Sequence, residues 1–566
     1  MLSDRLHIVT GAGLLTGLAS VFCVEAITLR PADASAAKNA HRIFNQLSDA
    51  GRQWGSSLNH NGLGFFPAIV PAGTVLYHGD RTDQQPTGME WLAFEVEHAE
   101  LFAPSHLVPP GVSIQSENKK KVEIRSQQQL PLLNTVASGH HIEPNDPTSP
   151  GDCAGDCDNT RAGSPVIKPH TRGYLHTYQV LRDLHILYID GMSAAKTNYG
   201  TLDSQDLVLC DDKIGNISVL PSFGDPIRAT MICELLADWG YDGFIRMETG
   251  FELIHCDFSK GLEFVSARRT FYTRDKMGND KNRLFQLARG VADRYDGLGA
   301  DRLKIDFSSM VSGWYFPINL TYTDTTRPDL IRFGSVGPQE LRMIKDHISH
   351  VCKLPRRFTV DWQAATDMIV KRYSRKFAFM MSPNISAIDF IEEIELLTLM
   401  YVDAPSLPGD TSSLLGMEGK PDSDMSEEIA RCTENYLLPA LSVRGLWELE
   451  DRLIYTAIET VTRNICTTIF TIWAALLTAS KDGEHSSSGM DAETPSRELK
   501  YAVDKGRREI RELMENLGWS EFKKVSPCLP NELMFVAMWP MGNEEDHFNP
   551  RCVAAEEFDF YRRNYW

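Results

Sequence analysis

Three short segments of the chain combine strand-forming residues with a side chain suited to nucleotide chemistry. The run Val-Leu-Tyr-His-Gly-Asp-Arg carries the imidazole of His78, and Glu-Trp-Leu-Ala-Phe-Glu carries the rings of Trp91 and Phe94. The run Phe-Glu-Leu-Ile-His-Cys-Asp-Phe carries the carboxylate of Glu252. Runs rich in β-branched and aromatic residues predict strands. An imidazole, a flat aromatic surface and a carboxylate on three strands predict a nucleotide cleft.

Glu252 is the residue that we predict to be catalytic. Its neighbours Phe251, Leu253 and Ile254 are apolar, and a charge among apolar side chains needs a partner or a function. A carboxylate on a rigid strand can stabilise an oxocarbenium-like transition state, such as forms when the bond between nicotinamide and ribose breaks. One well-placed group contributes about 3 kcal/mol to such a step. The competing interpretation is an edge strand on which Glu252 faces water.

His78, Gly79, Trp91 and Phe94 are the expected cofactor-binding residues. His78 precedes a glycine, where the backbone can approach a ligand closely, and a neutral imidazole can bond a ribose hydroxyl. Trp91 or Phe94 could stack on nicotinamide while the other ring packs in the core. The alternatives are a histidine that caps a turn and two core aromatics.

The order of these segments resembles the ADP-ribosyltransferase fold of the His-Tyr-Glu type over roughly residues 65–270. Leu-Tyr-His-Gly is followed by an aromatic strand and a helix-like stretch, and later Trp-Gly-Tyr-Asp-Gly-Phe leads towards Glu252. The resemblance implies an α+β domain that uses NAD as substrate. It also implies that His78 positions the adenosine ribose, Trp91 stacks on nicotinamide and Glu252 contacts the nicotinamide ribose.

Two departures from the family pattern favour a second interpretation. Asp80 stands where the family has a small hydroxyl residue, and its charge repels a pyrophosphate unless Arg81 neutralises it. The second-strand tyrosine is replaced by Trp91 or Phe94. We therefore predict a secreted NAD-dependent ADP-ribosyltransferase or NAD glycohydrolase with an unknown acceptor, or, alternatively, a catalytically inactive interaction protein on the same fold. A less favoured third function is a secreted glycoside hydrolase, which needs two carboxylates within about 5 to 10 Å in one aromatic-lined groove.

Length and periodicity predict the domain organisation. With 566 residues, the chain exceeds the size of a single core. We expect a β-rich domain over 27–275 with a polar insertion at 109–172, followed by a mainly α-helical domain over 276–566. In the second half, spacing typical of helices occurs at 282–295, 339–352, 362–377, 388–400, 424–437, 445–478 and 496–517. The predicted class is α+β.

The first residues and the cysteines indicate export. An apolar stretch from Ile8 to Val24 precedes small residues, which predicts a signal peptide over 1–26, with an uncleaved signal anchor as the alternative. Ten cysteines remain after it, so up to five disulfides are expected, without a deducible connectivity. Sequons begin at Asn216, Asn319 and Asn384.

Charge and motifs exclude other classes. A formal net charge of -19 disfavours nucleic-acid binding, which relies on clustered Lys and Arg. The apolar stretch 465–479 is short and contains four threonines, so we expect a buried helix rather than a membrane span. The cysteines are scattered rather than spaced for zinc, the acidic run at Glu544–His547 is typical of a capping turn, and we expect no metal site.

Overall fold

The computed structural model describes residues 29–59, 61–107, 170–197, 199–211, 224–271, 281–292, 297–298, 301–322, 330–403, 425–486, 496–524, 527–537, 542–558 and 563–564. The predicted signal peptide, most of the polar insertion, Asn216, Cys153 and Cys157 lie outside these residues.

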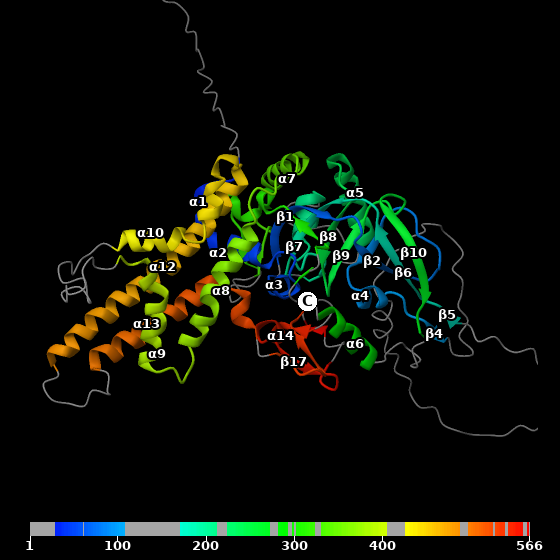
Figure 1. Cartoon of the computed structure of the whole chain (residues 1–566). Helices are drawn as coiled ribbons and strands as arrows, with labels where there is room; N and C mark the ends of the chain where they lie inside the picture. Colours follow the sequence, from blue (N-terminus) through cyan, green and yellow to red (C-terminus); the bar gives the residue numbers. More distant parts are fainter. Residues whose placement is uncertain are drawn as a thin grey trace, which may run out of the picture.

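A ten-stranded mixed sheet occupies the first half of the described chain (Figure 1). In sheet order its strands are β10 (Leu262–Arg269), β6 (Tyr174–Val180), β2 (Val75–Asp80), β3 (Glu90–Ala93), β9 (Phe251–His255), β8 (Gly243–Met247), β7 (Leu184–Gly191), β1 (Asn61–Val70) and β11 (Lys304–Ile305), with β12 (Val311–Ser312) also paired to β1. All neighbours are antiparallel except β7 and β8. The three strands predicted to carry the site are therefore adjacent, in the order β2, β3, β9.

Short helices cover the sheet and lead into it. These are α1 (Asp33–Lys38), α2 (Ala40–Asp49), α3 (Gln53–Leu58), α4 (Val96–Glu100), α5 (Asp225–Trp239) and α6 (Lys281–Ala292). Helix α5 was not predicted. It ends at Gly240, whose φ of +78° is a left-handed conformation that glycine adopts without strain.

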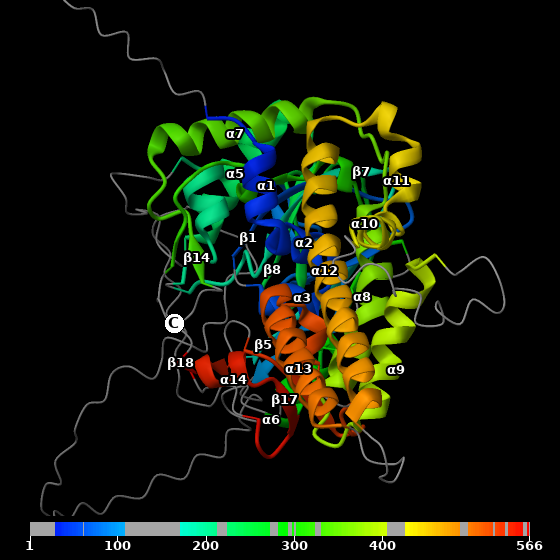
Figure 2. The ribbon, with the colours of Figure 1, turned by 90° about the vertical axis from the view of Figure 1, so that its left-hand side faces the viewer.

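A helical bundle forms the second half of the molecule. Its helices are α8 (Trp362–Met380), α9 (Ala387–Thr398), α10 (Ser426–Glu434), α11 (Leu438–Ser442), α12 (Leu449–Ser486) and α13 (Arg497–Leu517). Helix α7 (Pro338–Lys353) instead packs beside α5 and β12 of the sheet. Figure 2 shows α12 and α13 side by side, with α1 and α2 next to α12. Each helix predicted from periodicity is present, and the α+β class is confirmed.

The boundary expected near residue 275 does not separate the two halves cleanly. Helices α1 and α2 precede the sheet in sequence but pack against α12, whereas β11 and β12 follow the expected boundary and pair with β1. The C-terminal region also contains small sheets, formed by β15 (Glu532–Phe535) with β17 (Arg551–Ala554) and by β16 (Gly542–Asn543) with β18 (Arg563–Asn564). The remaining two-stranded pairs are β4 (His106–Leu107) with β5 (His170–Thr171) and β13 (Thr321–Tyr322) with β14 (Ile331–Arg332).

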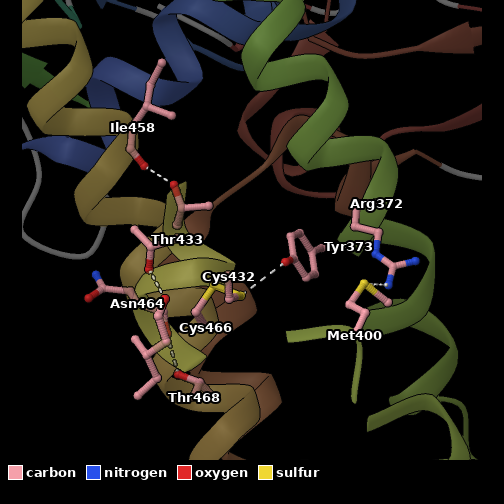
Figure 3. The surroundings of a disulfide bond; sticks show 11 residues. Arg372, Tyr373, Met400, Cys432, Thr433, Ile458, Asn464, Cys466 and Thr468 are labelled. Atoms are coloured by element: carbon pink, nitrogen blue, oxygen red, sulfur yellow. Dashed lines mark hydrogen bonds between the residues drawn. A yellow bond between two sulfur atoms is a disulfide. The ribbon is translucent and has the colours of Figure 1, made fainter. Parts of the chain in front are cut away.

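Three disulfides staple these elements, which confirms the disulfide prediction in part. They join Cys233 to Cys256, Cys432 to Cys466 and Cys528 to Cys552. Figure 3 shows the second, which links α10 to α12, with the Tyr373 hydroxyl of α8 lying 3.8 Å from the Cys432 sulfur. Cys210 and Cys352 are buried and form no disulfide.

Helix α12 is long and apolar enough to cross a membrane by length and composition. Half of its apolar stretch is buried inside the protein, where the helix contacts α2, α10 and α13.

Candidate functional site

Glu252 lies on β9 directly opposite Arg246 of β8. Its Oε1 accepts a hydrogen bond of 2.6 Å from Nε of Arg246, and both residues are at most 5% exposed. The carboxylate that we predicted to be catalytic is thus the counter-ion of a buried guanidinium.

This ion pair belongs to a larger buried network beside the sheet. Asp225 of α5 lies 3.4 Å from Arg246, 3.1 Å from Lys196 and 2.9 Å from Arg228. Lys196 also donates to Glu248 over 2.7 Å. Asp206 is the fourth carboxylate of the network and pairs with Arg228. It lies in the π-helical turn Ser204–Leu209. Three cations therefore lie among four carboxyl groups, in a setting where desolvation of an isolated charge would cost several kcal/mol.

The carboxyl groups of this network differ in their pKa values. Burial opposes ionisation of Asp225, but the charges of Arg246, Lys196 and Arg228 outweigh burial and hold its pKa well below its usual range. Burial raises the pKa of Glu248 to about 8, with Lys196 opposing the rise and Glu252 adding to it. Near neutral pH a protonated Glu248 leaves three negative and three positive charges in balance.

His78 faces the other side of the sheet from Glu252. The register places Tyr77 opposite Ala93, and Ala93 opposite Glu252, so these three side chains share one face. The next residue, His78, points to the opposite face. There its Nδ1 lies 2.7 Å from the Trp91 carbonyl oxygen. The structure brings the three strands together but does not turn both side chains towards one cleft.

The space beside Gly79 is filled by the chain itself. A Cβ at this position would lie 2.3 Å from the carbonyl oxygen of Ala99 and 3.1 Å from the nitrogen of Ala103. Trp91 is 3% exposed and belongs to the core. Phe94 is 1% exposed and belongs to the same core, and it also borders a cavity of about 520 Å³ on the side of Tyr77.

A larger cleft than this one lies elsewhere, between the bundle and one end of the sheet, and has a volume of about 1020 Å³. Its walls come from α2, α12, α13 and the start of β1. Two buried carboxylates contribute to its lining, Asp49 at the end of α2 and Asp190 at the end of β7, and neither forms an ion pair with another described residue.

Asp49 is 5% exposed, and burial raises its pKa to about 6. Its Oδ1 accepts a hydrogen bond from Oγ of Ser520 and its Oδ2 accepts one from Nδ2 of Asn59, both over 2.8 Å. These bonds and the charge of Arg52 oppose the effect of burial only in part.

Asp190 is 2% exposed, and burial raises its pKa to about 7. The negative charge of Asp49 adds to this rise, so the two carboxyls are close enough to repel. One oxygen of Asp190, Oδ1, accepts from the Tyr188 hydroxyl over 3.2 Å, and that hydroxyl in turn accepts from the Gly51 amide. The other oxygen, Oδ2, is buried without a hydrogen-bond partner in the described structure. Burial therefore raises the pKa values of both carboxyls, that of Asp190 more than that of Asp49.

The rest of the cleft is polar. Arg42 lies over the Trp314 ring at 4.8 Å, and burial lowers the pKa of His41 to about 4. One face of α12 contributes side chains with hydroxyl or amide groups, namely Thr460, Asn464, Thr467, Thr468 and Thr471. Such a lining suits a substrate rich in hydroxyl groups.

Sequence reasoning missed this pair. Asp190 closes the continuously apolar run of β7, the same signal that drew attention to Glu252. Asp49 carries no such signal, because it follows an ordinary amphipathic helix. The acidic run Glu544–Phe548, in contrast, forms α14 with a capping box between Asn543 and Asp546, so the predicted capping turn is confirmed.

Comparison with known proteins gives relatives without an assigned activity. Residues 28–284 match the family model described as the YPL277C N-terminal domain. The uncharacterized protein YOR389W of Saccharomyces cerevisiae is 26% identical over 573 residues, which cover 90% of this chain and 83% of that protein. The uncharacterized protein YPL277C of the same organism is 28% identical over 392 residues, which cover 59% of this chain and 74% of that protein. No solved structure matches.

Proposed function

We propose that the chain is a hydrolase whose acid and base are Asp190 and Asp49, and that its substrate is a glycoside. The observation that carries this proposal is the pair of buried carboxyls with pKa values raised to about 7 and about 6 at the wall of the 1020 Å³ cleft. Glycoside hydrolysis needs one carboxyl to donate a proton to the leaving group while a second, ionised carboxylate assists from the other side.

The two carboxyls divide the roles by their environment. Burial raises the pKa of Asp190 to about 7, above that of Asp49, so we assign Asp190 as the general acid. Asp49 is ionised more readily because Ser520 and Asn59 donate to it, so it acts as base or nucleophile. The pair titrates as a coupled unit, and the rate is expected to peak between about pH 6 and pH 7, falling on either side.

The test is hydrolysis of a panel of fluorogenic aryl glycosides by the purified full chain. Asp190→Asn and Asp49→Asn are each expected to lower kcat/KM by about 10²- to 10⁴-fold. Asp346→Asn, an exposed position on α7, is the matched control. Absence of hydrolysis by the unaltered protein across the panel, or equal rates in Asp190→Asn, would remove this function.

We propose NAD turnover at β2, β3 and β9 as the second function. Adjacency of these strands supports it, as does the pocket in which Phe94 meets Arg302, on the face that Glu252 shares with Tyr77. Arg302 could attract a phosphate, although it already pairs with Glu95 over 3.1 Å. The ion pair of Glu252 with Arg246 opposes catalysis there and favours the alternative of an inactive interaction protein on this sheet.

Measuring the release of nicotinamide from NAD distinguishes NAD turnover from an inactive interaction protein. Glu252→Gln should abolish release if NAD is the substrate, whereas Glu263→Gln, an exposed change on β10, should not. Glu248 is unsuitable as the control because it belongs to the same network. If no nicotinamide is released and NAD does not shift the Tm, the inactive interaction protein is the better supported function.

We also propose that the chain is secreted. Three disulfides support this, since such bonds persist in oxidising compartments. The sequon residues Asn319 and Asn384 are exposed, as glycosylation requires. Sequencing the N-terminus of the exported chain and treating it with an endoglycosidase test cleavage near residue 26 and glycosylation.

A further inference from the structure

Two histidines and an aspartate converge on the face of the sheet opposite Glu252. His78 and Asp80 are two residues apart on β2, and His176 of β6 lies directly opposite His78 in the register. One nitrogen of each ring and one carboxylate oxygen of Asp80 all lie within 4.8 Å of one another. Neither histidine is more than 2% exposed.

The orientation of His78 is fixed by the neighbouring strand. Its Nδ1 lies 2.7 Å from the Trp91 carbonyl oxygen, so the proton on this nitrogen is donated to the backbone. Nε2 then carries the lone pair. A hydrogen bond from one ring nitrogen to a backbone carbonyl is the usual way in which proteins orient a metal-binding imidazole.

The distance from His78 to Asp80 suits a bridging ion. Nε2 of His78 lies 4.0 Å from Oδ2 of Asp80, which is longer than a hydrogen bond. Two bonds from a zinc ion, each about 2.0 to 2.1 Å, span up to about 4 Å. Tetrahedral zinc ligands lie about 3.3 Å apart, so Asp80 must move inward by about 0.7 Å to share an ion with His78.

His176 would supply the third ligand, and its ring is also held by a hydrogen bond to a backbone carbonyl oxygen. Its Nε2 lies 2.7 Å from the Thr82 carbonyl oxygen, and its Nδ1 lies 3.4 Å from the Tyr178 hydroxyl. Two imidazoles and a carboxylate are the donor set preferred by zinc and its first-row neighbours.

We propose that His78, His176 and Asp80 bind one zinc-type divalent ion, with water or Tyr178 in the remaining position. The ion would join β2 to β6 and hold in place the connection that follows Asp80. Since Asp80 has a 25% exposed side chain, an ion can reach the site from solvent. This site is separate from the cleft of Asp49 and Asp190 and does not rest on the function proposed for it.

The alternative is a structural role, in which the two histidines are core residues that only donate hydrogen bonds to backbone carbonyl oxygens. In that case Asp80 is a turn residue, since its oxygens accept from the Arg81 amide and the Thr82 hydroxyl. The two interpretations differ in what they predict for Asp80. Only a metal site makes the metal affinity of the protein depend on that carboxylate.

The experiment is a calorimetric titration of the tag-free, chelator-treated full chain with Zn²⁺, repeated with Co²⁺ while visible absorption is recorded. One ion per chain is expected, with cobalt bands typical of four or five ligands and a Tm that rises with zinc. Mg²⁺, which prefers oxygen donors, is expected to produce neither effect.

Zinc titration of variants tests whether the ion binds at these three residues. His176→Gln and Asp80→Asn should each weaken zinc binding at least about 100-fold, while His350→Gln, an exposed histidine on α7, should leave it unchanged. Asp80 is the safer position if His176→Gln does not fold, because it is partly exposed. A folded chain that binds no zinc, or zinc affinity unchanged in Asp80→Asn, would overturn the site.

Discussion

Glu252 and Asp190 are both buried carboxylates at strands of one sheet, yet they have opposite partners. Arg246 donates to Glu252 over 2.6 Å, whereas no described cation pairs with Asp190, whose Oδ1 accepts from the neutral Tyr188 hydroxyl. Burial raises the pKa of Asp190 to about 7, while Glu252 remains the counter-ion of a guanidinium. Of these two carboxyls, the one that meets a guanidinium serves as its counter-ion, and the one without an ion-pair partner among the described residues has the raised pKa that a proton donor needs.

Arg246→Met should have the largest effect, because it leaves Glu252 and Asp225 without their shared cation. Removing one partner of a buried ion pair costs about 3 to 5 kcal/mol of unfolding free energy. Urea unfolding followed by circular dichroism measures it. Arg182→Met is the control, since Arg182 pairs with Asp242 with half of its side chain exposed and should cost below about 1 kcal/mol. Equal losses would show that burial does not distinguish the two ion pairs.

Asp190→Asn should act in the opposite direction at alkaline pH. The folded pKa of Asp190 is raised from 3.8 to about 7, so its contribution to stability is fully present below about pH 4 and is lost as the pH rises through 7. At pH 8 the ionised, unpaired carboxylate costs up to about 4 kcal/mol, which an amide avoids. The variant should therefore be more stable than the unaltered protein at pH 8 and similar at pH 4. A variant destabilised at both pH values would contradict the absence of a cation at this site.

The sequence shows which residues are unusual but not which partner each one meets. Strands β2, β3 and β9 followed from their β-branched and aromatic residues, the bundle helices followed from a period of 3.6, and Glu252 was recognised as a charge in an apolar run. Arg246 faces it only through the β8–β9 register, and Asp225 reaches it only because α5 packs beside the sheet. Asp49 and Asp190 are brought together by the docking of α2 and β7. Long-range contacts decide these charge states, and no local pattern encodes them.

Glu252→Gln and Glu248→Gln should differ at pH 7. The first removes an anion that Arg246 needs and should cost about 2 kcal/mol, because Asp225 remains as its other counter-ion. The second changes little, below about 1 kcal/mol, since burial raises the pKa of Glu248 to about 8 and the carboxyl is already neutral. Stability from protonated Glu248 is lost as the pH rises through 8, so Glu248→Gln should be the more stable protein at pH 9. Thermal melts of both variants at pH 7 and pH 9 measure the difference, and identical pH dependence would contradict it.

Gly79→Ala asks whether the sheet face beside Glu252 is filled or open. The added Cβ would meet the Ala99 carbonyl oxygen at 2.3 Å, so α4 must move, at a cost of about 1 to 3 kcal/mol. At Gly445 a Cβ would have no neighbour within 4 Å, and Gly445→Ala should be close to neutral. Urea unfolding of both variants gives the comparison. A Gly79→Ala protein as stable as Gly445→Ala would mean that the space beside Gly79 opens easily, which would favour a ligand there and strengthen the NAD proposal over the cleft of Asp190.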